Sequence, residues 1–316
     1  MNLGTDISWK LGLKNHILTA NSAARILVYH GVCKTDPFRF NSLFITVKKF
    51  ESQLKLYKKY FHLVSLDDFY MQRFSSERFN LCLSFDDGFA NNYEYILPLL
   101  EHYQVPAVFF VTGIRDAGYD VLWNDVLSIA GRYGPPKIVF RGEEFEKDHT
   151  KKYISLKHNK TLNEVLRGTG FEEKAELIAM FADLRIKVDS DYWLQMTSEQ
   201  IRTLSKNKWV TIGSHGYYHN DLAKVNAATL KKELHLSKNY LQDITGKEIR
   251  SVAFPYGSYS QQAVSEAKAE GYSQILATDF HFDEDRQDET MSERLIINPF
   301  ISNINQIHAN LRGNYR

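Results

Sequence analysis

Residues 80–89 read NLCLSFDDGF, an apolar run that ends in two aspartates and a glycine. The uncharged run predicts a strand buried on both faces, as in a parallel sheet. Gly88 permits the sharp turn that must follow such a strand. Asp86 and Asp87 are therefore expected at the carboxyl end of a parallel strand, where α/β folds carry their active sites.

Six further apolar segments are similar to this strand, and helical stretches separate them. They cover residues 25–29, 106–111, 209–213, 251–254, 274–277 and 295–297. Apolar side chains that step by three and four predict one helix from Val47 to Phe61 and another from Leu230 to Ile244, which Gly246 ends. The alternation predicts the α/β class, and about seven strands suit a distorted (β/α) barrel at least as well as a doubly wound sheet.

The alternation of apolar strands and helices is interrupted at about residues 123–196. It has few candidate strands, a polar helical run and a hairpin pattern, KIVFRGEEFEKD, at residues 137–148. We interpret it as a helical and hairpin insertion over the mouth or side of the barrel. The prediction is thus a single domain over residues 1–316, with its core at about residues 23–300.

The charge balance argues against a nucleic-acid partner. Thirty-nine Lys and Arg face 38 Asp and Glu, a formal net charge of +1, and the basic residues are scattered along the chain. Phosphate binding depends on clustered positive charge. The first twenty residues carry Asp6, Lys10 and Lys14 where a secretion signal needs an apolar stretch, and no apolar run approaches the roughly 18 residues of a membrane span. We therefore predict no membrane span and a cytoplasmic location.

A second polar motif follows the segment at residues 209–213. In TIGSHGYYHNDL, residues 211–222, His215 and His219 are four apart, so that both imidazoles can converge on one metal ion. With one aspartate of the first motif they make a facial set of ligands that leaves positions open for water and substrate. Either motif alone has a simpler interpretation: Asp-Asp-Gly as a turn or a helix cap, and the histidines as structural side chains. The combination is far more specific than its parts.

A third motif, SVAFPYGSYS at residues 251–260, continues the next apolar segment. Pro255 and Gly257 flank Tyr256, and this arrangement can aim the backbone N–H of Tyr256 at a developing oxyanion. A plain turn explains the same residues.

In this order the three motifs resemble those of the polysaccharide deacetylases with a NodB homology domain, also called carbohydrate esterase family four. The likeness extends from about residue 23 to residue 300, apart from the interruption. The resemblance implies that Asp86 is the general base and that Asp87, His215 and His219 hold one divalent metal ion. Zn²⁺ is the first choice, and Co²⁺, Ni²⁺, Mn²⁺ or Fe²⁺ are alternatives. It also implies a distorted (β/α) barrel, in agreement with the strand count.

The sequence departs from the family pattern at three places. Gly216 stands where the family usually has Ser or Thr, which predicts a looser histidine loop, and Ala253 stands in place of an arginine that orients the base. Near the C-terminus, RLIINPF at residues 294–300 lacks the histidine usually assigned as general acid. His30 closes the first apolar segment in ILVYHGV and is a replacement acid, as in the branch that resembles poly-N-acetylglucosamine deacetylases. A structural histidine at a strand end is the competing interpretation.

The resemblance implies hydrolysis of an N-acetyl group on an amino sugar of a polysaccharide, oligosaccharide or glycan precursor. Asp86 would take a proton from metal-activated water, the N–H of Tyr256 would receive the oxyanion, and His30 would protonate the leaving amine. Removal of an O-acetyl ester and a non-catalytic carbohydrate-binding relative are the alternatives. A phosphohydrolase with the same ions is disfavoured by the scattered basic charge. The sequence leaves open the sugar, the linkage and the oligomeric state.

Overall fold

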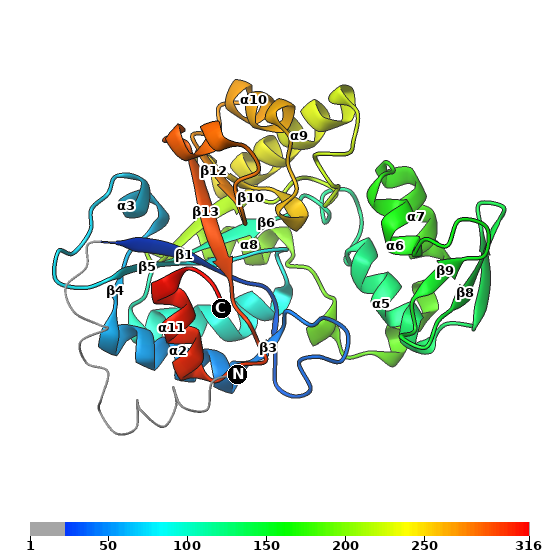
Figure 1. Ribbon diagram of the computed structural model, residues 1–316, viewed down its shortest axis with the longest axis horizontal. Coiled ribbons are helices and arrows are strands. Elements are labelled where there is room, and N and C mark those ends of the chain that lie inside the picture. The colour runs from blue at the N-terminus through cyan, green and yellow to red at the C-terminus, as the bar shows by residue number, and fades with distance from the viewer. Residues whose placement is uncertain (1–22, 316) are drawn as a thin grey trace.

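The computed structural model describes residues 23–315, so the first twenty residues, in which we predicted no secretion signal, lie outside the described chain. A parallel sheet closes into a seven-stranded barrel (Figure 1). Around the barrel the order is β1 (Ala24–Tyr29), β13 (Met291–Ile296), β12 (Gln274–Ala277), β11 (Ser251–Ala253), β10 (Val210–Ser214), β6 (Ala107–Val111) and β5 (Asn80–Phe85). β5 pairs with β1 to complete the ring, and the short β4 (His62–Leu63) pairs with β5 outside it. The distorted (β/α) barrel is confirmed.

Helices cover the outside of the barrel, and both helices predicted from periodicity are present. α2 (Val47–Tyr60) begins where the side chain of Thr46 accepts the N–H of Lys49, and it buries Phe50, Leu54 and Tyr57. α9 (Ala227–Thr245) ends at Gly246, as predicted. The others around the barrel are α3 (Leu66–Tyr70), α4 (Leu97–Tyr103), α8 (Ser198–Ser205), α10 (Gln261–Ala269) and α11 (Asn303–Arg312). No helix among the described residues is both long and apolar enough to cross a membrane.

Side chains from the strands fill the inside of the barrel, so that it is a packed core and not a pore. One buried cluster joins Ile26 of β1, Cys82 of β5, Phe110 of β6, Ala253 of β11 and Leu276 of β12. The core therefore fixes the strands, and the carboxyl ends of the strands gather at one rim.

Residues 123–196, which we call the arm, lie between β6 and β10 and project to one side of the barrel (Figure 1). The arm contains α5 (Trp123–Tyr133), α6 (Leu162–Arg167), α7 (Phe171–Met180) and an antiparallel sheet of β7 (Lys137–Phe140), β8 (Glu143–Lys147) and β9 (Tyr153–Ser155). The predicted hairpin is thus present as β7 and β8. The arm packs around its own buried cluster, which includes Trp123, Phe145 and Leu166.

Candidate active site

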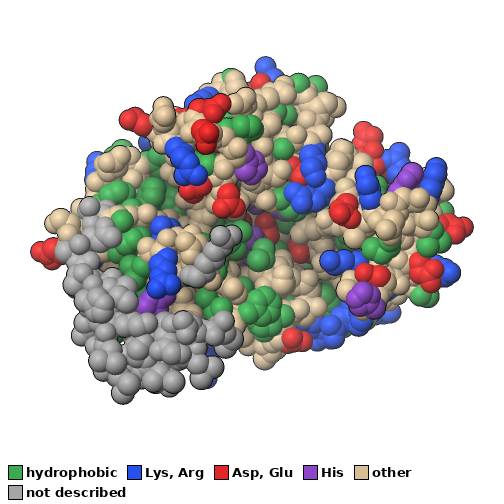
Figure 2. Space-filling view, viewed as in Figure 1, with side chains coloured by type: hydrophobic (Ala, Val, Ile, Leu, Met, Phe, Trp, Pro, Cys, Tyr) green, Lys and Arg blue, Asp and Glu red, His purple; other side chains and the backbone are tan. Residues whose placement is uncertain are grey.

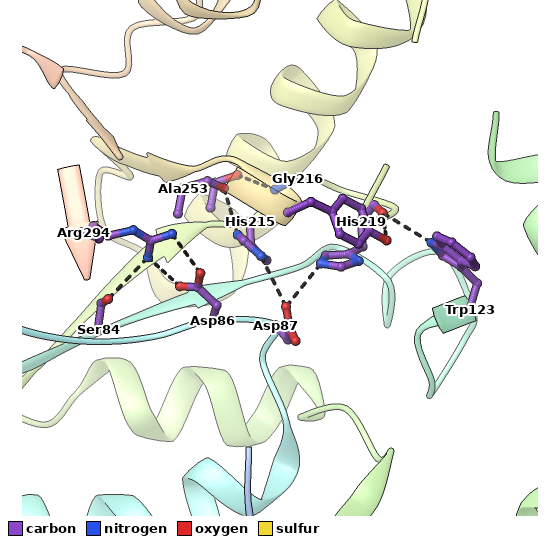
Figure 3. A network of polar contacts seen from close by, with 11 residues as sticks. Ser84, Asp86, Asp87, Trp123, His215, Gly216, His219, Ala253 and Arg294 are labelled. Atoms are coloured by element: carbon purple, nitrogen blue, oxygen red, sulfur yellow. Dashed lines mark hydrogen bonds and ion pairs between the residues drawn. The ribbon is translucent and has the colours of Figure 1, made fainter. Parts of the chain in front are cut away.

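Three loops at the carboxyl ends of β5, β10 and β11 form the candidate site (Figure 3). Each loop holds a residue other than glycine in the left-handed region of the backbone: Asp87 at φ 75°, His219 at φ 57° and Tyr256 at φ 62°. A side chain with a Cβ enters this region at a cost of about 1–2 kcal/mol, and such strain is commonest at functional sites. The left-handed conformation costs stability in each of these loops, so we infer that it is kept because it positions side chains for function.

Asp87, His215 and His219 converge on one point. The Nε2 atoms of His215 and His219 lie 3.3 and 3.2 Å from Oδ1 of Asp87, and the ligand atoms of the three residues lie within 4.8 Å of one another. All three side chains are buried. Two imidazoles and one carboxylate are a donor set for zinc and for other first-row divalent metals, so these residues fit a single cation.

Neighbouring groups prepare these side chains as ligands. Nδ1 of His215 lies 2.8 Å from the carbonyl oxygen of Ala253, so this nitrogen donates its N–H there, and Nε2 is the atom that faces Asp87 and would bind a cation. Burial lowers the pKa of His219, which favours the neutral ring that a metal ion needs. Burial opposes the charge on His215 too, but Asp86 and Asp87 outweigh it and raise the pKa of His215. Burial also opposes the charge on Asp87, yet hydrogen bonds from both histidines hold its pKa well below the ordinary value.

Asp86 faces a second buried side chain, Arg294 of β13. Nη1 and Nη2 of Arg294 lie 2.7 and 2.8 Å from Oδ1 and Oδ2 of Asp86, and Nη1 lies 3.3 Å from Oγ of Ser84. The Arg294 side chain is fully buried over the ring of Phe110. Burial disfavours the charge on Asp86, but Arg294 outweighs burial and holds the pKa of this carboxyl below its ordinary value. Asp86 is therefore ionised and fixed in orientation, as a general base needs to be.

The sequence left the partner of Asp86 open because Ala253 stands in place of the expected arginine. The structure supplies an arginine from another strand, β13, and this residue is the first letter of the RLIINPF segment. Ala253 has a different part in the site, because its carbonyl oxygen receives the N–H of His215.

The histidine loop, residues 215–221, is held firmly, so the looseness predicted from Gly216 is wrong. Gly216 has φ 75°, a conformation that favours glycine, and a Cβ there would lie 3.2 Å from Oε2 of Glu233. The same Oε2 accepts the backbone N–H groups of Tyr217 and Tyr218 at 2.7 and 3.0 Å. Glu233 comes from α9 and is fully buried, and this burial raises the pKa of its carboxyl. The side chain of Glu233 therefore holds the histidine loop, a role that we had expected of a Ser or Thr hydroxyl at position 216.

The arm braces the histidine loop through two cationic side chains. Nζ of Lys174, buried in α7, donates to Oδ1 of Asn220. Arg167 of α6 forms an ion pair with Asp221 at 2.8 Å and lies 4.4 Å from the ring centre of Tyr256. Burial lowers the pKa of Lys174 to about 8. The arm and the histidine loop therefore form one continuous network.

A pocket of about 450 Å³ opens at these loops. All six side chains singled out in the sequence line it: His30, Asp86, Asp87, His215, His219 and Tyr256. Residues 40–43 and side chains of α5 and α6 supply further parts of its wall. Figure 2 shows the corresponding hollow between the barrel and the arm, with histidine and acidic side chains visible inside it. The structure thus brings every predicted site residue to one cavity.

Asp125 is a site residue that sequence reasoning missed, as it missed Arg294. It lies at the start of α5, is 3% exposed and lines the pocket. Its Oδ2 atom has no hydrogen-bond partner among the described residues. Burial, with the charge of Asp87 nearby, holds the pKa of Asp125 well above its ordinary value, so this carboxyl is protonated. The only signal in the sequence is an acidic residue in the first turn of a helix, which usually has a capping role.

Comparisons with known proteins agree with this geometry. The family model described as polysaccharide deacetylase matches residues 75–162 and 179–275. No curated protein sequence matches the chain. Among solved structures, the Streptococcus pyogenes deacetylase PplD in complex with acetate has a TM-score of 0.60 and 16% identity, and the match covers 91% of this chain and 97% of that one. IcaB from Ammonifex degensii has a TM-score of 0.55 and 15% identity, with 93% and 98% covered. A de-N-acetylase from Aggregatibacter actinomycetemcomitans has a TM-score of 0.51 and 17% identity, with 88% and 96% covered. At these identities the likeness establishes the fold.

Proposed function

The chain belongs to the polysaccharide deacetylase family, whose model matches more than half of its residues, and we propose that it is a metal-dependent hydrolase that removes an N-acetyl group from an amino sugar. The substrate is a polysaccharide, an oligosaccharide or a glycan precursor. One observation carries the proposal: a buried ligand set for one cation lies beside a carboxylate that Arg294 keeps ionised and oriented. The similarity of fold to a de-N-acetylase supports an amide as the bond that is cleaved.

Asp87, His215 and His219 are the residues that would hold the cation, and Zn²⁺ is the first choice for this donor set. When bound, a divalent cation supplies the positive charge that makes water acidic near neutral pH and polarises a carbonyl group. Co²⁺, Ni²⁺, Mn²⁺ or Fe²⁺ suit the same donors.

Asp86 acts as the general base. It accepts a proton from the water that attacks the acetamide carbonyl, and Arg294 keeps it in the ionised form that can do so. Arg294 is a positioning residue, because it acts through Asp86.

His30 and Tyr256 complete the proposed reaction. His30 follows β1, lines the pocket and protonates the amine nitrogen as the carbon–nitrogen bond breaks, which yields the free amine and acetate. The backbone N–H of Tyr256, on a loop held in the left-handed conformation, donates to the oxyanion of the tetrahedral intermediate.

The test is acetate release from N-acetylated chito-oligosaccharides by metal-stripped protein before and after addition of Zn²⁺, Co²⁺ or Ni²⁺. Asp87→Ala and His219→Ala should lose both metal binding and activity. Asp86→Asn should keep the metal and lose turnover by about 100- to 10,000-fold. His235→Ala is the matched control, because His235 is an exposed histidine on α9. Full activity of Asp86→Asn would exclude the assigned base.

The same residues suit removal of an O-acetyl ester, which has an easier leaving group. Matched sugars that carry either an N-acetyl or an O-acetyl group separate the two reactions. Sugar binding without acetate release from either would indicate the non-catalytic carbohydrate-binding alternative. The cytoplasmic location inferred from the sequence stays a prediction, and fractionation of native cells tests it.

A further inference from the structure

A second and larger pocket adjoins the active-site pocket. Its volume is about 780 Å³, and it shares the lining residues Phe40, Asn124, Ser128 and Asn163 with the active-site pocket. α5 runs along both, from Asn124 beside the active site to Arg132, eight residues further. At 1.5 Å per residue these positions lie about 12 Å apart, so the two pockets together can hold a glycan longer than a single sugar ring.

Basic side chains outnumber acidic ones in the lining of this second pocket. Arg39, Arg132, Lys151 and Lys152 all line it, and Glu164 is the one acidic side chain in the lining. Glu164 is already engaged, because its Oε2 accepts the N–H and the hydroxyl of Thr161, each at 2.7 Å. Figure 2 shows Lys and Arg side chains gathered along the lower margin of the molecule, between the barrel and the arm. Basic residues that are scattered along the chain are therefore clustered in space.

Exposed Lys and Arg are ordinarily solvated, and carboxylates such as Asp36 near Arg39 and Glu164 near Lys152 act on this cluster only from beyond ion-pair distance. Within the part of the chain that the structure describes, none of the four cations forms an ion pair, although other basic side chains of the arm do: Lys137 with Glu146, and Arg141 with Glu173. The guanidinium groups of Arg39 and Arg132 lie 5.5 and 6.0 Å from the ring centre of Phe40. The ring attracts each guanidinium, and an anion bound between the two would also offset their mutual repulsion.

The cluster is also fixed in place. The turn at residues 148–152 packs against α5 at Gly131, where a Cβ would lie 2.7 Å from the carbonyl oxygen of Lys151. Within that turn, the backbone N–H of Asp148 donates to the carbonyl oxygen of Lys152 at 2.9 Å, and the N–H of Lys151 donates to the carbonyl oxygen of Asp148 at 3.0 Å. On the opposite wall, Nη2 of Arg39 donates to the hydroxyl of Tyr133 at 2.6 Å. The backbone of this surface is therefore held before a ligand arrives, so that binding has to order only the side chains of the exposed lysines.

We propose that this second pocket, which we call the basic pocket, binds an anionic group on the same glycan whose acetamido group enters the active site. The inference rests on the proposed function and names its substrate class: an acetylated glycan with a sugar-linked anion, either the carboxylate of a uronic acid or a phosphate. Guanidinium forks bind both groups with two hydrogen bonds, and lysines add positive charge. The anion lies beyond the reacting sugar, because the two pockets share a wall but not the cation ligands.

The test compares three N-acetylated oligosaccharides of equal length: one neutral, one with a uronic acid and one with a phosphate. Each is assayed for acetate release with the wild-type protein, with Lys151→Gln/Lys152→Gln and with Lys157→Gln/Lys160→Gln. The second double variant is a matched control, because it removes two exposed lysines from the same arm outside the basic pocket. All four lysines are exposed, so both variants should fold.

We expect the wild type to prefer a charged substrate, and Lys151→Gln/Lys152→Gln to lower kcat/KM on it by about tenfold. The neutral substrate and the control variant should change by less than about twofold. Equal rates on neutral and charged substrates in the wild type, or equal losses in the two double variants, would overturn the proposal. The substrate that shows the larger loss identifies the anion as carboxylate or phosphate.

A binding experiment separates failure of this inference from failure of the proposed function. Oligogalacturonate carries carboxylates and no acetamido group, and a malto-oligosaccharide of equal length is its neutral counterpart. If no substrate releases acetate but oligogalacturonate binds and Lys151→Gln/Lys152→Gln weakens that binding, the basic pocket stands without the deacetylase reaction. If acetate is released equally from all three substrates and oligogalacturonate does not bind, the deacetylase stands and the basic pocket fails.

Discussion

Replacing Arg294 by methionine should destabilise the protein far more than breaking a surface ion pair does. The substitution keeps an apolar stem over Phe110 but leaves the carboxylate of Asp86, which is 4% exposed, without a counter-charge. Removal of one partner from a buried charge pair costs about 3–5 kcal/mol of unfolding free energy. Domains are stable by only about 5–15 kcal/mol, so the urea midpoint should fall by a large fraction.

The assay is urea unfolding of metal-stripped protein, followed by circular dichroism, for the wild type, Arg294→Met, Asp86→Asn and the double variant. Removal of metal keeps the free energy of ligand binding out of the comparison. The double variant has neither buried charge, so it should recover most of the loss, with a coupling energy above about 2 kcal/mol. Arg202→Met is the control: it breaks the exposed pair with Glu199 and should cost less than about 1 kcal/mol.

Two results would refute this reasoning. One is a cost for Arg294→Met no larger than that for Arg202→Met. The other is a double variant no more stable than either single variant, because the two charges would then not stabilise each other in the folded protein.

Three further predictions concern the histidine loop and its supports. The pKa of Lys174 is about 8 in the folded protein and 10.5 ordinarily, so the unfolded chain binds more protons between these values. The contribution of Lys174 to the unfolding free energy should therefore rise by about 3 kcal/mol from about pH 8 to 10.5, and the difference between the wild type and Lys174→Met, measured by urea unfolding at each pH, should grow by that amount. Gly216→Ser restores the usual family residue at φ 75° and should lower stability by about 1–2 kcal/mol in thermal unfolding. Gly170→Ser, at the helix N-cap of α7, should cost nothing. Glu233→Ala leaves the backbone N–H groups of Tyr217 and Tyr218 without their acceptor, at a cost of about 1–3 kcal/mol each. This variant should therefore bind Zn²⁺ more weakly in a competition titration. Glu233→Gln keeps an acceptor oxygen and should bind Zn²⁺ nearly as the wild type does.

The barrel and its motif residues could be predicted because their signals are local. Apart from β13, the barrel strands coincide with short, mainly apolar runs, and the residues directly after β5, β10 and β11 must meet at one rim of a parallel barrel. That rule alone places Asp87 and His215 in the same pocket, although neither the segment with Asp87 nor the segment with His215 contains any sign of the other. The hairpin of the arm was predictable for the same local reason.

Arg294 could not be predicted, because its partner depends on the register of the closed barrel. The residue lies inside β13 and pairs with Ile26 across the strands, but its side chain reaches Asp86, 208 positions earlier in the chain. A single sequence contains no record of which strand lies beside which. The strand itself gives little signal, because Ser292, Glu293 and Arg294 make half of β13 polar, and the predicted apolar segment begins only at Leu295.

The cluster around Arg39 and Lys151 was hidden for a similar reason. These residues are more than one hundred positions apart in the chain, and the packing of the 148–152 turn on α5 brings them to one pocket. An even distribution of charge along a chain therefore says little about its distribution in space.

The position of Arg294 near the C-terminus also bears on when the enzyme can first work during its own synthesis. During translation, the loops with Asp87, His215 and His219 are synthesised well before β13, the strand that lies between β12 and β1 in the closed barrel. Domains generally fold as units, so neither the ring of strands nor the pair of Asp86 with Arg294 can be complete before β13 has emerged. Until β13 emerges, Asp86 has no fixed direction and no neighbouring positive charge from Arg294. The proposed base therefore gains its arginine from the same strand that closes the barrel, and a chain cut short before residue 294 lacks both the closed ring of strands and the partner of Asp86.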